Sequence, residues 1–286
     1  MIPFLGVLYD GFAYGMLLFL LSVGLSVTLG MMNFVNLAHC SCAMLGAYVT
    51  ISLTQGLGWP FLATLPVAFV AAALTSVALE RVLFRRFYRA TDLDQCLVTI
   101  GVVFVSIAMV AYLYGTILQS VQVPPYLKGS IPIAGLNLGV YRLFLIVVAL
   151  VVAAALVLGL EYTRLGAQVR AAVDNQRMAR GLGIDVDRAF AVTFALGSGL
   201  AGLGGALAIE IVGLDPAFAF TFLIYVLIVV SVGGLGSIGG SFVAASLLGV
   251  FDVAGKYYVP EIGAFLIYAL MVALLMWRPA GLFGKR

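Results

Sequence analysis

Long apolar runs constrain this chain more than any other feature of its sequence. Nine of them can be marked, near residues 8–30, 37–54, 61–80, 97–117, 141–160, 189–211, 217–232, 241–254 and 262–277. A bilayer core of roughly 30 Å requires about 20 apolar residues per helix. Because the chain is 64% hydrophobic and only 9% charged, which is far from the composition of a soluble domain, the sequence predicts an integral membrane protein.

The runs do not alternate between apolar and polar residues, so they predict α-helices rather than barrel strands. We expect an all-α, polytopic transmembrane bundle with eight or nine membrane segments. Several runs are short, which predicts that some segments are broken or re-entrant. No polar stretch is long enough for a soluble domain, so residues 1–286 form a single membrane domain, and the longest polar stretch, about 161–188, is expected to form one or two short helices.

Most basic residues fall in three clusters, and the positive-inside rule places all three in the cytoplasm. The crossings between them then put the C-terminus in the cytoplasm and the N-terminus outside, with the Pro- and Gly-rich residues 122–139 as an external loop. The clusters consist of Arg81, Arg85, Arg86 and Arg89; of Arg164, Arg170, Arg177, Arg180 and Arg188; and of Arg278, Lys285 and Arg286.

Three polar residues interrupt the apolar sequence "MMNFVNLAHCSC" at residues 31–42. On one helix, Asn33, Asn36 and His39 would share a third of the circumference. Polar side chains within a membrane usually face the bundle interior. They either bond to neighbouring helices and stabilise a break in the segment, or line a translocation path, and both roles are compatible.

Two carboxylates lie near the end of the run at 189–211. Glu210 is expected near the external mouth, where it either lines the path or is a surface residue. Asp215 precedes Pro216 and is expected to cap the next helix. A buried Glu210 together with His39 would suit a proton-coupled carrier, although no sequence feature brings the two residues together.

The polar stretch at 161–188 is either a solvated connector or a helix-loop-helix that docks a partner. Its pattern predicts a short amphipathic helix that ends at Gly181 or Gly183. One face of this helix would carry Val169, Val173, Met178 and Leu182.

Glycine-rich sequences indicate close helix packing and a duplication. "GSGLAGLGGALA" at 197–208 contains two rows of small residues that allow close backbone approach between helices. Residues 22–34 and 231–242 both run from an apolar segment through glycines into the next. They either mark duplicated halves, as in many transporters, or share only composition.

Several catalytic and binding motifs are missing from the sequence. It contains no G-x-x-x-x-G-K-[ST], H-E-x-x-H or G-x-S-x-G, so we expect neither a P-loop nor common hydrolase chemistry, and no enzyme. Cys40, Cys42 and Cys96 lie in or beside apolar runs and lack metal-ligand spacing, so no metal or other cofactor is expected. No basic patch interleaved with aromatic residues indicates nucleic acid.

Several blocks resemble one family of transporters. "NLAHCSCAMLGAYV" at 36–49 resembles the N-x-A-H-G…M-x-G-A-Y signature of the LivH-like permeases of branched-chain amino-acid ABC importers. "GAQVRAAVDNQRMARGLGIDVDR" is similar to their cytoplasmic segment, and "AFAVTFALGSGLAGLGGAL", "GGLGSIGG" and "RPAGLFG" follow in the same order. The matching blocks extend from about residue 20 to residue 284.

The resemblance implies a bacterial inner-membrane permease subunit that is energised in trans. Its partners would be a second, LivM-like permease, two cytoplasmic ATP-binding cassette subunits, a periplasmic binding protein and membrane lipid. The translocation path would then involve Asn33, Asn36, His39, Ser41 and Glu210. The loop near 164–188 would couple to the ATPase through Arg164, Arg170, Asp174, Asn175 and Gly183.

The chain departs from the family pattern directly after His39. Family members often have Gly-Glu there, whereas this chain has Cys40 and Ser41, so a carboxylate is missing from the expected path. Relatives carry branched-chain or other amino acids, urea, short amides or organic acids, and the loss of a negative charge would suit an anionic substrate. The alternative function is a self-sufficient secondary transporter or channel in which His39 and Glu210 handle protons.

Overall fold

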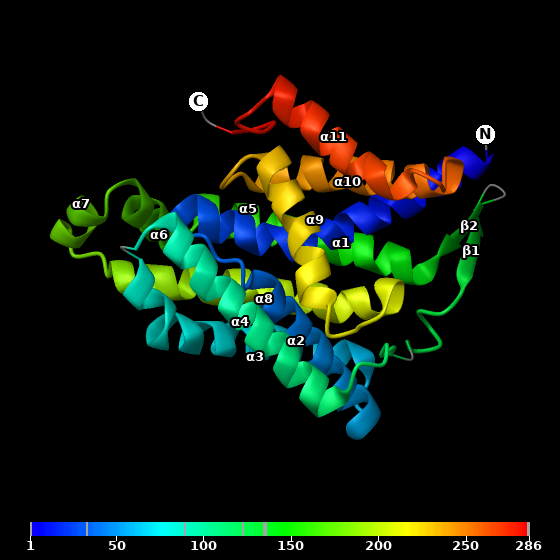
Figure 1. The fold of residues 1–286 in the computed structure, drawn as a ribbon, viewed down its shortest axis with the longest axis horizontal. Coiled ribbons are helices and arrows are strands. Elements are labelled where there is room, and N and C mark those ends of the chain that lie inside the picture. Colours follow the sequence, from blue (N-terminus) through cyan, green and yellow to red (C-terminus); the bar gives the residue numbers. More distant parts are fainter. Residues whose placement is uncertain (1, 33, 89, 122, 134–135, 285–286) are drawn as a thin grey trace.

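The helices of this chain run side by side along one axis. The computed structural model describes residues 2–32, 34–88, 90–121, 123–133 and 136–284. Figure 1 shows a two-stranded hairpin at one end of the bundle and two short helices, α6 and α7, at the other. We call these the hairpin end and the arginine end. The elements are α1 (Ile2–Met32), α2 (His39–Ile51), α3 (Phe61–Val82), α4 (Asp92–Tyr114), β1 (Ser130–Ile133), β2 (Leu136–Gly139), α5 (Val140–Tyr162), α6 (Arg164–Asp174), α7 (Gln176–Gly181), α8 (Val186–Val212), α9 (Phe218–Gly233), α10 (Ile238–Tyr258) and α11 (Gly263–Trp277).

Each predicted apolar run contains a helix, which confirms the all-α transmembrane bundle. Six described helices, α1, α3, α4, α5, α8 and α10, are long and apolar enough to cross a membrane. The apolar helices α9 and α11 are shorter, and α2 has 13 residues that continue into a π-helical turn at Ser52–Gly56. Short segments are therefore present, as the run lengths predict.

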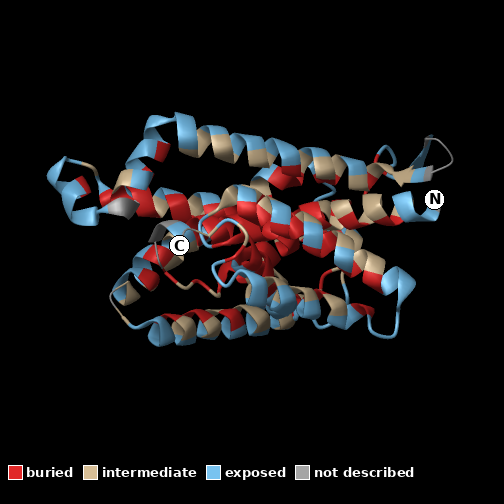
Figure 2. Cartoon of the chain, turned by 90° about the horizontal axis from the view of Figure 1, so that it is seen from above, coloured by how far each residue is buried: buried red, intermediate tan, exposed pale blue. Residues whose placement is uncertain are grey.

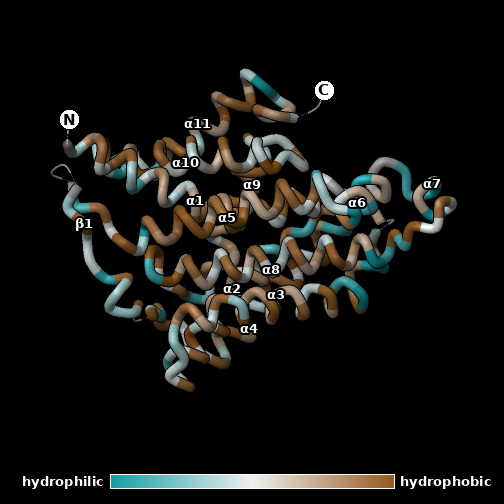
Figure 3. The backbone as a smooth tube through the Cα atoms, turned by 180° about the vertical axis from the view of Figure 1, so that it is seen from behind, coloured by the Kyte–Doolittle hydropathy of each residue, from teal (hydrophilic) through white to brown (hydrophobic). Residues whose placement is uncertain are grey.

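Helices α1 and α8 form the buried axis of the bundle. Their apolar windows are 83% and 78% buried, compared with 11% for α4 and 17% for α5. Figure 2 shows the same division, with buried residues in the centre and exposed residues around them. In Figure 3 the outer helices are hydrophobic along their length, and hydrophilic residues gather toward the arginine end. This apolar outer surface is what contact with lipid requires.

The small residues of α8 allow its neighbours to approach closely. Gly24 of α1 packs on Gly197, and Gly46 of α2 packs on Gly202. Both predicted small-residue rows are buried. Helices in lipid associate mainly through such van der Waals packing, so these contacts fix the position of α2 between α3 and α8.

The chain contains two groups of four consecutive helices, and the first helix of each group packs on the third helix of the other. The groups are α1–α4 and α8–α11; α1 lies along α10, and α8 lies along α3. In this order the break after α1 corresponds to the break after α8. Residues 22–32 end α1, whereas residues 231–242 span the turn from α9 to α10, so the two similar stretches occupy different positions. Their likeness therefore does not mark equivalent positions of two halves, and the internal repeat stays a prediction.

The described arginines of the three clusters gather at the arginine end. Arg85, between α3 and α4, forms an ion pair with Asp187 at the start of α8. Asp187 also pairs with Arg180 of α7, at 3.0 Å. The segment that follows α11 returns to the same end, where Leu282 N donates to Val232 O at 2.7 Å. The N-terminal end of α1 lies at the hairpin end (Figure 1).

The α1–α8 contact gives a first prediction. A β-carbon at Gly24 would come within 2.7 Å of the Gly197 carbonyl carbon, so Gly24→Ala should force the two helices apart and lower the free energy of unfolding by about 1–3 kcal/mol. Thermal unfolding in detergent measures this change. The control is Gly101→Ala on α4, where a β-carbon meets nothing within 4 Å. Equal melting temperatures for the two variants would contradict the close contact.

Candidate functional site

The chain between α1 and α2 is not helical, and it lies inside the bundle. Residues 34–38 connect Met32 at the arginine end to His39, the first residue of α2. His39 Nε2 donates to the carbonyl oxygen of Leu21 at 3.0 Å. Leu21 is about 16 Å along the axis from the end of α1, at 1.5 Å per residue. The chain therefore re-enters the membrane region as an extended segment before α2 begins, which we call the interrupted segment.

Side chains of α4 pair with the backbone of the interrupted segment. Val35 N donates to Gln95 Oε1 at 3.0 Å, and Thr99 Oγ1 lies 3.4 Å from Val35 O. Gln95 Nε2 also donates to the carbonyl oxygens of Phe87 and Ala90, both at 3.3 Å. Non-helical backbone at membrane depth is tolerated only where protein or a wet cavity satisfies its polar groups, and Gln95 and Thr99 satisfy Val35.

Sequence reasoning missed Gln95 and Thr99. The available signal was their spacing of four residues on one helix, which puts both side chains on one face. Aromatic packing adds to their effect, because the buried Phe34 ring lies 5.5 Å from Phe84 and 5.4 Å from Tyr88, between ring centroids. The interrupted segment is thus fixed by α4 and by the turn after α3.

Three of the predicted path residues lie at this segment with polar atoms unpaired. Asn36 Oδ1, His39 Nδ1 and Ser41 Oγ are buried and have no hydrogen-bond partner among the described residues. A buried polar atom without a partner costs roughly 1–3 kcal/mol, so each of these three atoms calls for an explanation, and a functional contact is one. Asn33, also predicted here, lies outside the described residues.

A row of polar side chains continues from Ser41 along α2. Tyr48 follows Ser41 by seven residues, so the two share one face of α2, and Gln55 lies beyond them in the π-helical turn at Ser52–Gly56. Tyr48 OH is buried and unpaired within the described part of the chain. Gln55 Nε2 donates to Ser120 O at 2.7 Å. Gln55 and Ser120 line a cavity of about 560 Å³ at the hairpin end, so the row connects the interrupted segment with that end.

The structure does not bring Glu210 to the other path residues. Glu210 is exposed in the last turn of α8, near the hairpin end, and the described hydrogen bond of His39 goes to Leu21. A proton relay between Glu210 and His39 thus has no support from the geometry. The prediction that Asp215 caps the next helix is wrong: α9 follows Ala217 without a side-chain cap, and Asp215 contributes its backbone oxygen to Phe218 N at 3.1 Å.

The predicted polar stretch forms two helices at the arginine end. Thr163 caps α6 by accepting from Gly166 N at 3.1 Å. Asn175 Oδ1 accepts from Met178 N at 3.0 Å and starts α7. Gly183 has a φ of +82°, which favours glycine, and the chain turns there toward α8. Asn175 and Gly183, both predicted to matter here, therefore shape the two turns.

The expected apolar face of this stretch is wrong. Val169 is buried, but Met178 is 65% and Leu182 78% exposed, because the cap at Asn175 starts a new helix in a new direction. The side chain of Val173 is outside the described part. Val169 instead joins a small apolar cluster with residues of α6, α7 and α8, whose other buried members are Ala172, Ala179, Val186, Ala189 and Phe190.

The α6–α7 pair presents its charged residues outward. Arg164 and Arg170 are exposed, and Arg170 Nη2 lies 3.5 Å from the carbonyl oxygen of Glu161. The side chain of Asp174 is not among those described. With its own apolar cluster and the ion pairs of Asp187 with Arg85 and Arg180, this pair packs against α8 and exposes charged side chains at the arginine end.

Comparison with known proteins identifies a family over nearly the whole chain. The profile of the family described as "Branched-chain amino acid transport system / permease component" matches residues 7–275. The high-affinity branched-chain amino acid transport system permease protein LivH of Escherichia coli K12 is 25% identical, over 99% of this chain and 96% of its own length.

Other relatives have the same extent of match. The permease protein BraD of Pseudomonas aeruginosa is 25% identical, over 97% of this chain and 95% of its own length. A probable LivH of Methanocaldococcus jannaschii is 27% identical, over 97% of this chain and 92% of its own length. No solved structure matches the chain significantly.

The pairing of Gln95 with the interrupted segment gives a second prediction. Gln95→Leu should lower the free energy of unfolding by about 1–3 kcal/mol, since Val35 N loses its partner in a partly buried position. Hydrogen exchange at Val35 and thermal unfolding in detergent measure the effect. Ser106→Ala is the matched control, because Ser106 bonds only the carbonyl of Val102 on its own helix. Unchanged exchange at Val35 in Gln95→Leu would show that the contact is dispensable.

Proposed function

This chain belongs to the family of permease components of branched-chain amino acid transport systems, and from this premise we propose that it is the membrane permease of an ABC importer. Its substrate is a branched-chain amino acid or a related small polar or organic-acid molecule. ATP hydrolysis on separate cytoplasmic subunits drives the transport. The interrupted segment and the first turn of α2 carry this proposal, because their buried, unpaired polar atoms lie inside an apolar bundle.

The proposed path combines the interrupted segment with the polar row of α2. Asn36, His39 and Ser41 offer both acceptor and donor groups, and Tyr48 and Gln55 continue toward the hairpin end. Polar side chains inside a membrane commonly mark substrate pathways, and binding sites of transporters often use broken helices. Asn33 and Glu210 are included on the sequence pattern alone, with Glu210 at the mouth.

The proposed partners follow from the family and from the arginine end. They are a second, LivM-like permease, two ATP-binding cassette subunits, and a periplasmic binding protein. The α6–α7 pair docks the ATPase with Arg164, Arg170 and Asp174, while Asn175 and Gly183 hold its shape. Its packing on α8 supports this role, because α8 runs from the arginine end through the centre of the bundle.

The arginine clusters support an orientation in a bacterial inner membrane. By the positive-inside rule the arginine end, with α6, α7 and the C-terminus, faces the cytoplasm. The N-terminus and the β1–β2 hairpin then face the periplasm.

Reconstitution tests the proposed function. The proteoliposomes contain both permeases, the ATPase subunits and the binding protein. Uptake should require ATP on the side of the membrane where the ATPase subunits lie. A Walker-lysine variant of the ATPase should abolish it. Uptake by this chain in vesicles without any ATPase subunit would instead identify a self-sufficient carrier or channel.

Ser41 gives a third prediction, which concerns the substrate. A carboxylate at this buried position would repel an anionic substrate, so Ser41→Glu should lower uptake of carboxylate substrates by about tenfold, which corresponds to about 1.4 kcal/mol. Ser41→Gln is the matched neutral control and should transport at a near-normal rate. If Ser41→Glu transports carboxylate substrates as well as Ser41→Gln does, the missing negative charge has no role in selectivity.

Arg170 gives a fourth prediction, which concerns coupling. Arg170→Glu reverses an exposed charge of α6 and should lower ATP-driven uptake several-fold, or weaken ATPase binding, without changing the melting temperature of the permease. Arg170→Lys keeps the charge and should behave nearly as the native chain. Co-purification measures ATPase binding, and uptake measures coupling. Normal ATP-driven uptake by Arg170→Glu would show that Arg170 does not belong to the docking surface.

A further inference from the structure

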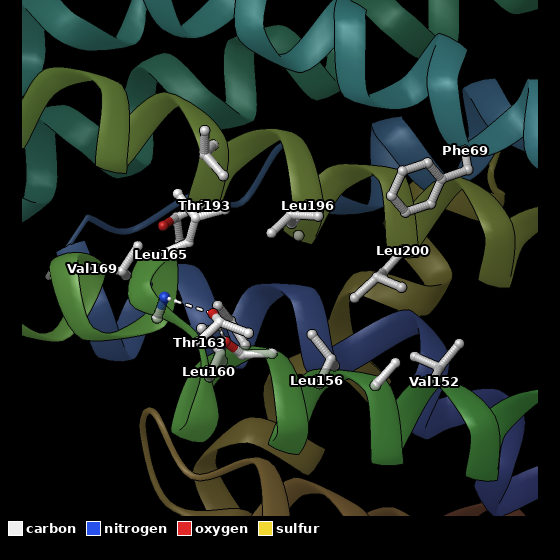
Figure 4. Close-up of a pocket in the computed structure, with 16 residues that line it drawn as sticks. Phe69, Val152, Leu156, Leu160, Thr163, Leu165, Val169, Thr193, Leu196 and Leu200 are labelled. Carbon is white, nitrogen blue, oxygen red and sulfur yellow. Dashed lines mark hydrogen bonds between the residues drawn. The ribbon is translucent and has the colours of Figure 1, made fainter.

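An apolar groove lies between α5 and α8 in the half of the bundle next to the arginine end. It encloses about 350 Å³. Figure 4 shows its length, from Val152 and Phe69 at one end to Leu165 and Val169 of α6 at the other. The groove exists because small residues line it, among them Ala155, Gly159, Gly166 and Gly197.

The walls of the groove are open to the surroundings of the bundle. Leu196 is 43% and Val192 39% exposed, and both line the groove. No charged side chain belongs to the lining. In a membrane such a space meets the hydrocarbon of the leaflet nearest the arginine end, so its chemistry suits an alkyl chain.

The groove continues into a polar cavity at the membrane border. That cavity, of about 480 Å³, shares Leu165, Val169 and Val192 with the groove. Its other walls include Gln168, Asp185 and Arg188. An apolar slot that leads directly into a polar cavity has the form of a site for an amphiphile.

The polar cavity offers the remaining donors of one arginine to a phosphate. Arg188 uses Nε for its ion pair with Asp185, at 2.9 Å, and neither of its Nη atoms has a partner among the described residues. Arginine binds phosphate oxygens through two parallel donors, and basic residues beside a membrane attract anionic lipid.

We propose that this groove is a specific site for an anionic phospholipid, whose acyl chain occupies the space between α5 and α8 and whose phosphate binds Arg188 at the polar cavity. A second protein helix fits less well, because the groove opens at one end into a polar cavity that carries Arg188, where a phosphate can bind. Leu165 and Val169 of α6 line both cavities, so the bound lipid contacts the membrane core and α6 together.

The bound lipid therefore stabilises the packing of α6 on α8. Helix α6 rests on the small apolar cluster around Val169, and the acyl chain adds apolar contacts on the side that faces α5. The site follows from the shape and charge of the chain alone, so it stands whether or not the chain transports amino acids.

Native mass spectrometry of the detergent-purified permease complex tests the site. After equilibration with phosphatidylglycerol, phosphatidylethanolamine and phosphatidylcholine in equal amounts, we expect one retained phosphatidylglycerol for each copy of this chain. Ala155→Phe should abolish retention by filling the groove. Ala154→Phe is the matched control, since Ala154 is equally exposed but does not line the groove.

The headgroup contact is tested with substitutions of exposed residues, which should leave the stability of the fold unchanged. Arg188→Gln should weaken retention about fivefold, as expected for one basic residue near a membrane surface, and Arg188→Lys should restore most of it. Arg177→Gln, whose arginine lines neither cavity, should have no effect. Equal retention of all three lipids by the native chain, or full retention by Ala155→Phe, would overturn the proposal.

A photoreactive residue in place of Leu196 identifies the occupant directly. Cross-linking to phosphatidylglycerol in the assembled complex supports the lipid site. Cross-linking to the second permease would show that the groove is a protein interface and would contradict it.

Discussion

The pairing of backbone polar groups away from water controls this structure. In hydrocarbon an unpaired amide or carbonyl costs several kilocalories per mole, so a chain that stops being helical inside a membrane needs partners from neighbouring helices. Gln95 and Thr99 of α4 supply them for Val35, and His39 adds a bond to Leu21 on α1. These contacts allow the chain to turn back into the bundle and start α2 in its interior.

Close packing around α8 keeps the interrupted segment in place. The glycines of α8 let α1, α2 and α3 approach its backbone, so α2 lies in the middle of the protein with Ser41 and Tyr48 buried. At the arginine end α8 continues into the α6–α7 pair through the capped turn at Asp185. A displacement of α6 and α7 would thus act on the same helix that packs against α2, which links the proposed docking surface with the proposed path.

Much of the fold could be predicted from the sequence, because membrane helices are specified by local composition. The nine apolar runs, the arginine clusters and the glycine rows all correspond to features of the structure. The partners of the break could not be predicted, since Gln95 and Val35 are 60 residues apart and only tertiary packing brings them together. The expected face of Met178 and Leu182 failed because a local cap at Asn175 outweighed the helical period.

The central claim is that the interrupted segment lies on the substrate path, and water accessibility tests it most directly. Asn36→Cys can be introduced into a chain whose cysteines, Cys40, Cys42 and Cys96, are replaced, and labelled with a small, membrane-impermeant thiol reagent in the assembled transporter. We expect labelling during ATP turnover and protection by substrate. If Cys at this position stays unreactive in every state while the variant still transports, the segment is a structural element and the path lies elsewhere.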